Sequence, residues 1–355
     1  MIAMKEELSM IEKNKTRILV ERPRDRKMIE VKWVYRTKLN ADGSTNKNTA
    51  KLVVKGYINQ IFGVDYSNTF AQIARLDTIR LLLSVIAQND WRVYQLNVKS
   101  TFLNGYLQEE IYVEQPEGFV KEGEEDKVYL LKKTLYGLKQ APRAWYSRID
   151  KHLLNLGFAK SLFESTLYVK HNGVGILTIS LYVDDLLVTG NHTSLVEKFK
   201  LEMIEVFEMT NLGLMTFFLG MEIKQSEHEV FIGHKKYAKE ILKKFKLNEC
   251  KEIRTPLNQK EKLNKDDGTS RIDQTYFRSM IGCLMYLTAT KPNILNVVSI
   301  LSWFIHCASE MHLKVAKRVI RYVKGTYDFG INLREAKSSS WLVFQIVIGE
   351  APLMI

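Results

Sequence analysis

Two adjacent acidic residues, Asp184 and Asp185, stand between two strongly apolar segments, 176–181 and 186–188. Apolar segments on both sides predict a buried β-hairpin with the two carboxylates at its turn. A buried acidic pair is unfavourable unless a cation compensates its charge, and Mg²⁺ suits this role because it prefers carboxylate and phosphate oxygens. The alternative is that aspartate simply favours turns and that this turn lies in water. The pair therefore predicts either a magnesium site or a solvated turn.

The segment that contains this pair, 181–185, is one of several motifs along the chain. The motifs before it are 52–57, 96–105, 112–116 and 135–146, and those after it are 218–220 and 286–292. With these motifs in this order and at these spacings, the sequence resembles the reverse transcriptase of copia-type long-terminal-repeat retrotransposons, a fragment of their Pol polyprotein. The resemblance runs from near Ala3 to about Ile331 and covers most of the chain.

The resemblance implies an α+β fold, a right-hand polymerase of fingers, palm and thumb followed by a C-terminal helical connection region. The implied domains are 1–230 for fingers and palm, 231–253 for the thumb, 254–274 for a linker and 275–333 for the connection region. Residues 334–355 are expected to form an aberrant tail in place of a ribonuclease H domain. A frameshift explains such a tail, and a naturally short end is the alternative.

The resemblance also implies an activity and a set of site residues. The activity is RNA-directed DNA polymerisation by two-metal phosphoryl transfer, with Mg²⁺ or Mn²⁺ as cofactor. The implied catalytic and metal-binding positions are Asp184, Asp185 and Asn97. The other implied positions are Lys51, Phe102 and Gln140 for the nucleotide, Phe218, Leu219 and Gly220 for the primer grip, and Lys236, Lys239, Lys243 and Lys244 for nucleic-acid phosphates.

The sequence departs from the family pattern at two of these places. Asn97 stands where the family carries aspartate, and a neutral amide is a weaker magnesium ligand than a carboxylate. We therefore expect impaired polymerisation; the alternative is a catalytically dead remnant that still binds primer–template. In the fingers, Thr49 and Lys51 stand where the family usually has lysine and arginine, which weakens a triphosphate clamp.

Composition agrees with a polyanionic partner. The 355 residues contain 52 Lys plus Arg and 40 Asp plus Glu, a formal net charge of +12. The resemblance implies that the partners are an RNA or DNA template with its primer and deoxynucleoside triphosphates. The oligomeric state is not predicted.

No apolar run reaches the ~18 residues of a membrane span. Three cysteines without a Cys-x-x-Cys pair fit a reducing compartment. The expected location is the cytoplasm, within a virus-like particle in an intact element, with the nucleus as the alternative.

Hydrophobic periodicity predicts the elements that must position these residues. Helices are expected at about 1–15, 77–88, 142–156, 195–207, 235–245, 276–289, 293–307 and 310–324. Strands are expected at 31–39, 50–57, 91–98, 111–113, 175–183, 186–188, 217–224 and 229–232. The dipeptide Asp42-Gly43 predicts the turn of a hairpin between the first two of these strands.

Overall fold

A computed structural model of the chain describes residues 1–39, 44–70, 75–173, 175–258, 263–334, 344–348 and 351–352. The chain divides into two compact units, each built from two separate stretches. The first unit consists of residues 1–74 and 95–213, and the second consists of residues 75–94 and 214–355. Both units combine helices with antiparallel strands, so the predicted mixture of helix and sheet is confirmed.

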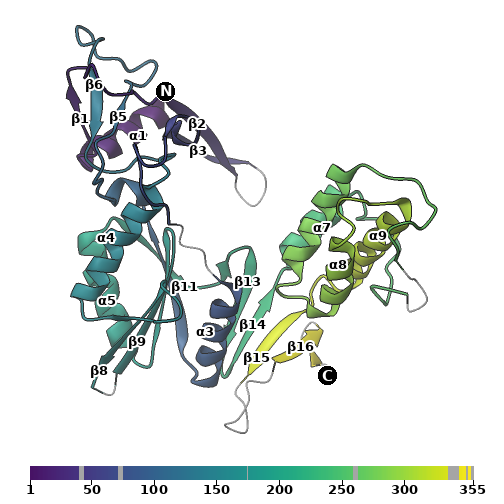
Figure 1. The fold of residues 1–355 in the computed structure, drawn as a ribbon. Coiled ribbons are helices and arrows are strands. Elements are labelled where there is room, and N and C mark those ends of the chain that lie inside the picture. Colours follow the sequence, from purple (N-terminus) through teal and green to yellow (C-terminus); the bar gives the residue numbers. More distant parts are fainter. Residues whose placement is uncertain are drawn as a thin grey trace. The chain divides into compact units, whose positions relative to one another are not determined.

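The first unit begins with a helix that packs on a long hairpin. The helix α1 (Ile2–Lys13) lies against β3 (Thr45–Val54), which pairs with β2 (Val31–Leu39) (Figure 1). The alternating apolar residues of β3 place Leu52 and Val54 in a core that also contains Ile11 of α1. The predicted turn at Asp42-Gly43 lies outside the described residues. A short helix, α2 (Gly56–Asn59), follows β3.

The same unit contains the sheet that carries the acidic pair. Its six strands lie in the order β11-β4-β10-β9-β8-β7. Their bounds are β4 Arg92–Val98, β7 Ala159–Lys160, β8 Leu167–Asn172, β9 Gly175–Tyr182, β10 Asp185–Gly190 and β11 Met209–Leu214. The helices α4 (Ala141–Asn155) and α5 (Thr193–Val206) lie along one side of this sheet (Figure 1).

A small three-stranded sheet completes the first unit. Its strands are β1 (Arg17–Val20), β6 (Val128–Leu131) and β5 (Tyr112–Val113), in that order. A short 3-10 helix, η1 (Thr101–Asn104), follows β4 in the chain and precedes β5. Neither β1 nor β6 was predicted from the sequence.

The second unit combines a sheet with a group of helices. Its strands lie in the order β12-β13-β14-β15-β16-β17. Their bounds are β12 Phe217–Phe218, β13 Met221–Ser226, β14 Glu229–Gly233, β15 Gly330–Arg334, β16 Phe344–Ile348 and β17 Ala351–Pro352. The helix α3 (Leu76–Gln88) comes from the early part of the sequence and packs against β14 and β15 (Figure 1).

The remaining helices of this unit share one hydrophobic core. They are α6 (Lys235–Lys244), α7 (Gln274–Leu287), η2 (Pro292–Ile294), α8 (Leu295–Ser302) and α9 (Glu310–Gly325). Ile241 of α6, Leu284 of α7 and Val319 of α9 all belong to this core. The helix of the predicted thumb therefore packs against the helices of the predicted connection region. The predicted boundary at 333/334 falls inside β15, which pairs with β14.

Two further differences concern element bounds, and a third concerns a strand that the sequence did not indicate. The strand predicted over 217–224 is interrupted by a turn between β12 and β13, and the helix predicted over 293–307 ends at Ser302. The strand β8 was not predicted either. No helix in the described part of the chain combines the length and the apolar character that a membrane crossing requires.

Candidate active site

The hairpin of β9 and β10 carries the acidic pair at its turn. Tyr182 pairs with Asp185, so Val183 and Asp184 form a two-residue connection between strands. The flanking Leu181 and Leu186 are fully buried, as the apolar pattern predicts. Val183 has a φ angle of +48°, which is strained for a β-branched residue. Strain of this kind persists only where the surroundings hold the backbone in place.

Two hydrogen bonds hold this turn. The indole Nε1 of Trp145, a fully buried residue of α4, donates to the carbonyl oxygen of Val183 at 2.6 Å. The backbone nitrogen of Val98 in β4 donates to the carbonyl oxygen of Asp184 at 2.7 Å. Trp145 is itself fixed by edge-to-face packing on Phe207, with ring centroids 5.4 Å apart. The position of the carboxylates is therefore set by a helix and a neighbouring strand.

Asn97 of β4 contacts both carboxylates with one nitrogen. Its Nδ2 donates to Asp184 Oδ2 and to Asp185 Oδ1, each at 3.1 Å. Gln95, two residues earlier on the same strand, donates its Nε2 to Asp185 Oδ1 at 3.0 Å. The three predicted catalytic positions therefore lie together, and the amide acts as a hydrogen-bond donor. An amide that donates here presents its nitrogen, and not its oxygen, to the acidic pair.

The carboxyl group of Asp185 is partly buried. Burial raises the pKa of Asp185 above its ordinary value, and the negative charge of Asp184 acts in the same direction. The hydrogen bonds from Asn97 and Gln95 oppose this effect by stabilising the ionised form. The two amides thus partly compensate the negative charge of the acidic pair, which a cation would otherwise do.

The donor set fits one divalent cation better than two. Within the described residues, no group of three His, Cys, Asp or Glu side chains lies where it could hold a metal ion. Asp184 and Asp185 together bring two negative charges, and Asn97 occupies one oxygen of each with its N–H group. Two divalent ions need more negative charge than this pair provides. One ion is compatible with the two carboxylates, provided that the Asn97 amide turns its oxygen toward the ion.

Lys51 and Phe102 meet at Tyr136. The ammonium of Lys51 lies 4.9 Å from the centroid of the Tyr136 ring, and the Phe102 ring packs against the same ring at 5.1 Å. Burial raises the pKa of the Tyr136 hydroxyl, and the charges of Glu7 and Asp184 raise it further. Lys51 and Phe102, two of the predicted nucleotide-binding residues, therefore contact the same tyrosine. The charge of Asp184 acts on the hydroxyl of that tyrosine. Lys51 also pairs with Glu7 of α1 at 2.8 Å, a contact that the sequence did not predict.

The third predicted nucleotide-binding residue, Gln140, lies in a different setting. Its side chain is fully buried, and its Oε1 accepts a hydrogen bond from Gln60 Nε2 at 2.9 Å. Its Nε2 donates to the carbonyl oxygen of Asp65 at 3.2 Å. Both ends of the Gln140 amide therefore bind protein groups, and they fasten the segment that contains Gln60 and Asp65. Contact of Gln140 with a nucleotide stays a prediction.

The predicted primer-grip residues form a tight turn in the second unit. Phe218 pairs with Met221, and Leu219 and Gly220 both have positive φ angles, +47° and +74°. Two consecutive left-handed residues are the mark of a type I′ hairpin turn. The hydroxyl of Tyr286 in α7 donates to the carbonyl oxygen of Leu219, and a Cβ atom at Gly220 would collide with the same hydroxyl. The Phe218 side chain is buried, with 2% exposure, and is part of the hydrophobic core.

The predicted nucleic-acid-binding lysines lie on the solvent side of α6. Lys236, Lys239, Lys243 and Lys244 are all exposed, whereas Ala238, Ile241 and Leu242 of the same helix are buried. The Lys239 ammonium lies 5.1 Å from the centroid of the Tyr327 ring, and Lys244 Nζ lies 3.5 Å from Cys283 Sγ. The ammonium groups of these four lysines are therefore exposed to solvent on α6.

Comparison with known proteins identifies the family. Residues 14–259 match the family model described as reverse transcriptase (RNA-dependent DNA polymerase). The chain belongs to this reverse transcriptase family. The resemblance to copia-type retrotransposon polymerases that the motifs indicate is confirmed.

Several relatives of this reverse transcriptase domain are transposon proteins. It is 36% identical over 313 residues to the retrovirus-related Pol polyprotein from transposon RE1 of Arabidopsis thaliana, covering 88% of the chain and 21% of the relative. It is 35% identical over 336 residues to that from transposon TNT 1-94 of Nicotiana tabacum, covering 92% and 25%. A putative transposon Ty5-1 protein of Saccharomyces cerevisiae is 33% identical over 251 residues, covering 70% and 82%. The chain thus spans only about a fifth to a quarter of the Pol polyproteins that it matches.

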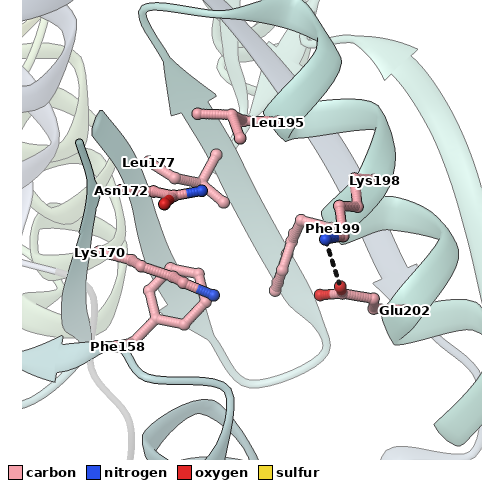
Figure 2. Close-up of a pocket in the computed structure, with 8 residues that line it drawn as sticks. All are labelled: Phe158, Lys170, Asn172, Leu177, Leu195, Lys198, Phe199 and Glu202. Atoms are coloured by element: carbon pink, nitrogen blue, oxygen red, sulfur yellow. Dashed lines mark ion pairs between the residues drawn. The ribbon is translucent and has the colours of Figure 1, made fainter. Parts of the chain in front are cut away.

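A small cavity in the first unit is unrelated to the acidic pair. It holds about 50 Å³ and lies between the strands β8 and β9 and the helix α5 (Figure 2). Its walls include Phe158, Leu177 and Phe199, and the pair of Lys198 and Glu202 lies beside it. None of the residues predicted for the reverse transcriptase site lines this cavity, and its volume is too small for a nucleotide.

Proposed function

We propose that the chain is the reverse transcriptase domain of a copia-type Pol polyprotein and that Asn97 impairs its RNA-directed DNA polymerisation. Its proposed ligands are an RNA or DNA template with a primer, deoxynucleoside triphosphates and Mg²⁺, for which Mn²⁺ can substitute. The observation that carries this proposal is the meeting of Asn97, Asp184 and Asp185 at one strained turn. Such a turn places two carboxylates where a cation and phosphates can reach them.

The proposal includes a right-hand arrangement. The fingers and palm would come from residues 1–230, the thumb from 231–253 and the connection region from 275–333, with 254–274 as the linker. The hairpin of β2 and β3 and the α1 helix support the assignment of fingers, and the sheet with the acidic pair supports that of a palm. The exposed lysines of α6 support a thumb helix that contacts nucleic-acid phosphates.

The roles of the site residues follow from their chemistry. Asp184 and Asp185 would hold Mg²⁺ through their carboxylate oxygens. When bound, this ion supplies positive charge that activates the primer 3′ hydroxyl and neutralises the phosphate under attack. Phe102 would exclude a ribose 2′ hydroxyl by its bulk, and Lys51 would attract the triphosphate. The turn at Leu219 and Gly220 would contact the primer end.

Asn97 limits the rate in this scheme. In the structure the N–H group of Asn97 faces the carboxylates, so ion binding must first rotate the amide. The rotated amide then contributes a neutral oxygen where a charged oxygen is needed. A loss of ~4 kcal/mol of transition-state stabilisation corresponds to about a thousandfold in rate. We therefore expect binding of primer–template with very slow extension.

A second candidate function is binding without any chemistry. The observation that favours it is that one amide already bridges both carboxylates, which reduces their need for a cation. A primer-extension assay with Mg²⁺ and with Mn²⁺, run beside filter binding of the same labelled RNA–DNA duplex, separates the two. Slow extension that stops when Asp184 is changed to Asn supports the polymerase. Binding with no extension in either metal supports the remnant, and absence of binding refutes both.

A further inference from the structure

Two neighbouring glutamates of α1 form ion pairs with two lysines of β3. Glu6 Oε2 lies 2.8 Å from Lys47 Nζ, and both side chains are more than half exposed. Glu7 Oε2 lies 2.8 Å from Lys51 Nζ, but the Glu7 side chain is only 3% exposed, against 37% for Lys51. Both ion pairs therefore join a glutamate of α1 to a lysine of β3. They differ in the burial of the glutamate side chain.

Lys51 is the counter-ion on which the buried carboxylate depends. The other oxygen of Glu7, Oε1, is buried without a hydrogen-bond partner among the described residues. A buried carboxylate that loses its cation is strongly destabilised, because neither water nor another charge replaces the partner. Any anion that draws Lys51 away must therefore overcome this loss. The exposed pair of Glu6 and Lys47 imposes no comparable cost, since water solvates both groups when they separate.

The buried pair adjoins the candidate active site. Lys51 lies over the ring of Tyr136, which packs on Phe102. The charges of Glu7 and Asp184 both act on the Tyr136 hydroxyl. A polyphosphate that approached Asp184 and Phe102 would thus find the ammonium of Lys51 already neutralised by a carboxylate of the protein.

We propose that Glu7 is an internal competitor for polyphosphate at Lys51: it holds the ammonium in the absence of nucleotide and lowers the affinity for a triphosphate. This inference rests on the proposed function, because it takes Lys51 as the triphosphate contact. A nucleoside triphosphate and the pyrophosphate product share the chemistry that would compete with Glu7. Binding of the nucleotide then exchanges one ion pair for another and gains less from Lys51 than a free cation would give.

The test measures binding of inorganic tripolyphosphate to the full chain by titration calorimetry, without divalent metal. Glu7→Gln keeps the size of the side chain and removes its charge, and Glu6→Gln changes the net charge by the same amount at the exposed pair. We expect Glu7→Gln to tighten binding about tenfold or more and Glu6→Gln to change it less than twofold. The gain should disappear in Glu7→Gln combined with Lys51→Gln. Repeating the series with dTTP and with pyrophosphate shows whether the nucleoside or only the phosphates matter.

Unchanged affinity in a folded Glu7→Gln protein, or a gain that survives Lys51→Gln, overturns the proposal. If Glu7→Gln does not fold, Glu7→Gln combined with Lys51→Gln decides, because this variant leaves no buried charge without a partner. A competitor at Lys51 predicts less than a threefold loss of tripolyphosphate binding in the double variant, and any larger loss overturns the proposal. Duplex binding and primer extension are recorded separately, so a failure of the proposed polymerase function remains distinguishable from a failure of the competition.

Discussion

Asn97 Nδ2 and Asp184 Oδ2 lie 3.1 Å apart, and the same nitrogen is equally far from Asp185 Oδ1. One neutral side chain therefore bridges the two carboxylates at the turn of β9 and β10. An aspartate in place of Asn97 would put three carboxylates together, and such a group needs a cation. The identity of residue 97 thus decides whether the turn depends on metal.

The first prediction follows from this bridge. Asn97→Asp should lower the free energy of unfolding by about 2–4 kcal/mol in metal-free buffer, because two hydrogen bonds are lost and like charges gather. Mg²⁺ should restore the melting temperature of Asn97→Asp and raise that of the unaltered protein much less, because Asn97 brings no charge to the ion. Primer extension should rise by about a hundredfold or more, since one metal-ligating charge is returned.

Gln95→Glu is the matched control for this experiment. It also removes an N–H donor to Asp185 and adds one negative charge on β4, but at a position that is not a predicted ligand. It should lose stability without gaining extension. Efficient extension by the unaltered chain, or equal gains in both variants, would contradict the role assigned to Asn97.

The second prediction concerns the indole that holds the strained turn. Trp145→Phe keeps an aromatic ring in the core but removes the donor to the Val183 carbonyl, which should cost about 1–2 kcal/mol of stability. Trp33→Phe removes the same atoms where Nε1 donates at 3.3 Å to the carbonyl of Glu117 on the surface, and it should cost less than about 0.5 kcal/mol. Chemical denaturation measures both. Equal losses would mean that the turn does not depend on Trp145.

The third prediction is a pH dependence of stability. Burial, with the positive charge of Lys291 nearby, lowers the pKa of His234 to about 4. An unfolded histidine titrates near 6.5, so between about pH 6.5 and 4 the unfolded chain binds the extra proton. Stability should fall by about 3 kcal/mol as the pH drops through this window. His234→Asn retains a polar partner for Thr290, which lies 2.7 Å from His234 Nδ1, and should flatten this slope. An unchanged slope in that variant would assign the acid sensitivity to other groups.

The fourth prediction concerns the exposed lysines of α6. If Lys236 and Lys243 contact phosphates, changing both to Gln should reduce the slope of log affinity against log salt by about two for an RNA–DNA duplex. Lys198→Gln, on the exposed side of α5, is the control and should leave the slope unchanged. Filter binding between low and physiological salt gives both slopes. A loss of affinity at all salt concentrations with the same slope would argue for misfolding instead.

Much of the framework could be predicted from the sequence because it rests on local patterns. The 3.6-residue period of α3 and the proline at the start of α4 mark these helices, and apolar runs mark β9 and β10. The short strands β1, β6 and β8 leave no such pattern, and β15 becomes a strand through its pairing with β14, about a hundred residues earlier in the chain. Tertiary pairing determined these elements.

The acidic pair and Asn97 were found through motifs, but the contacts around them were not. Glu7 lies on a charged stretch that looks solvated in the sequence, and only the packing of α1 on β3 buries it. The sequence likewise did not indicate that Gln60 and Asp65 bind the two ends of the Gln140 amide. A single sequence carries no signal for contacts between residues that far apart.

The helix α3 has a consequence for how the protein is made. Its apolar face, with Ile79, Leu83 and Ile86, is buried against strands that include β15, whose first residue follows the end of α3 by about 240 residues. At roughly 5–20 residues per second, a ribosome needs on the order of ten to fifty seconds to produce that partner. During this interval the apolar face of α3 is exposed on the nascent chain. The yield of folded recombinant protein should therefore rise when cells are grown at a lower temperature. It should also rise when chaperones that bind nascent chains are co-expressed.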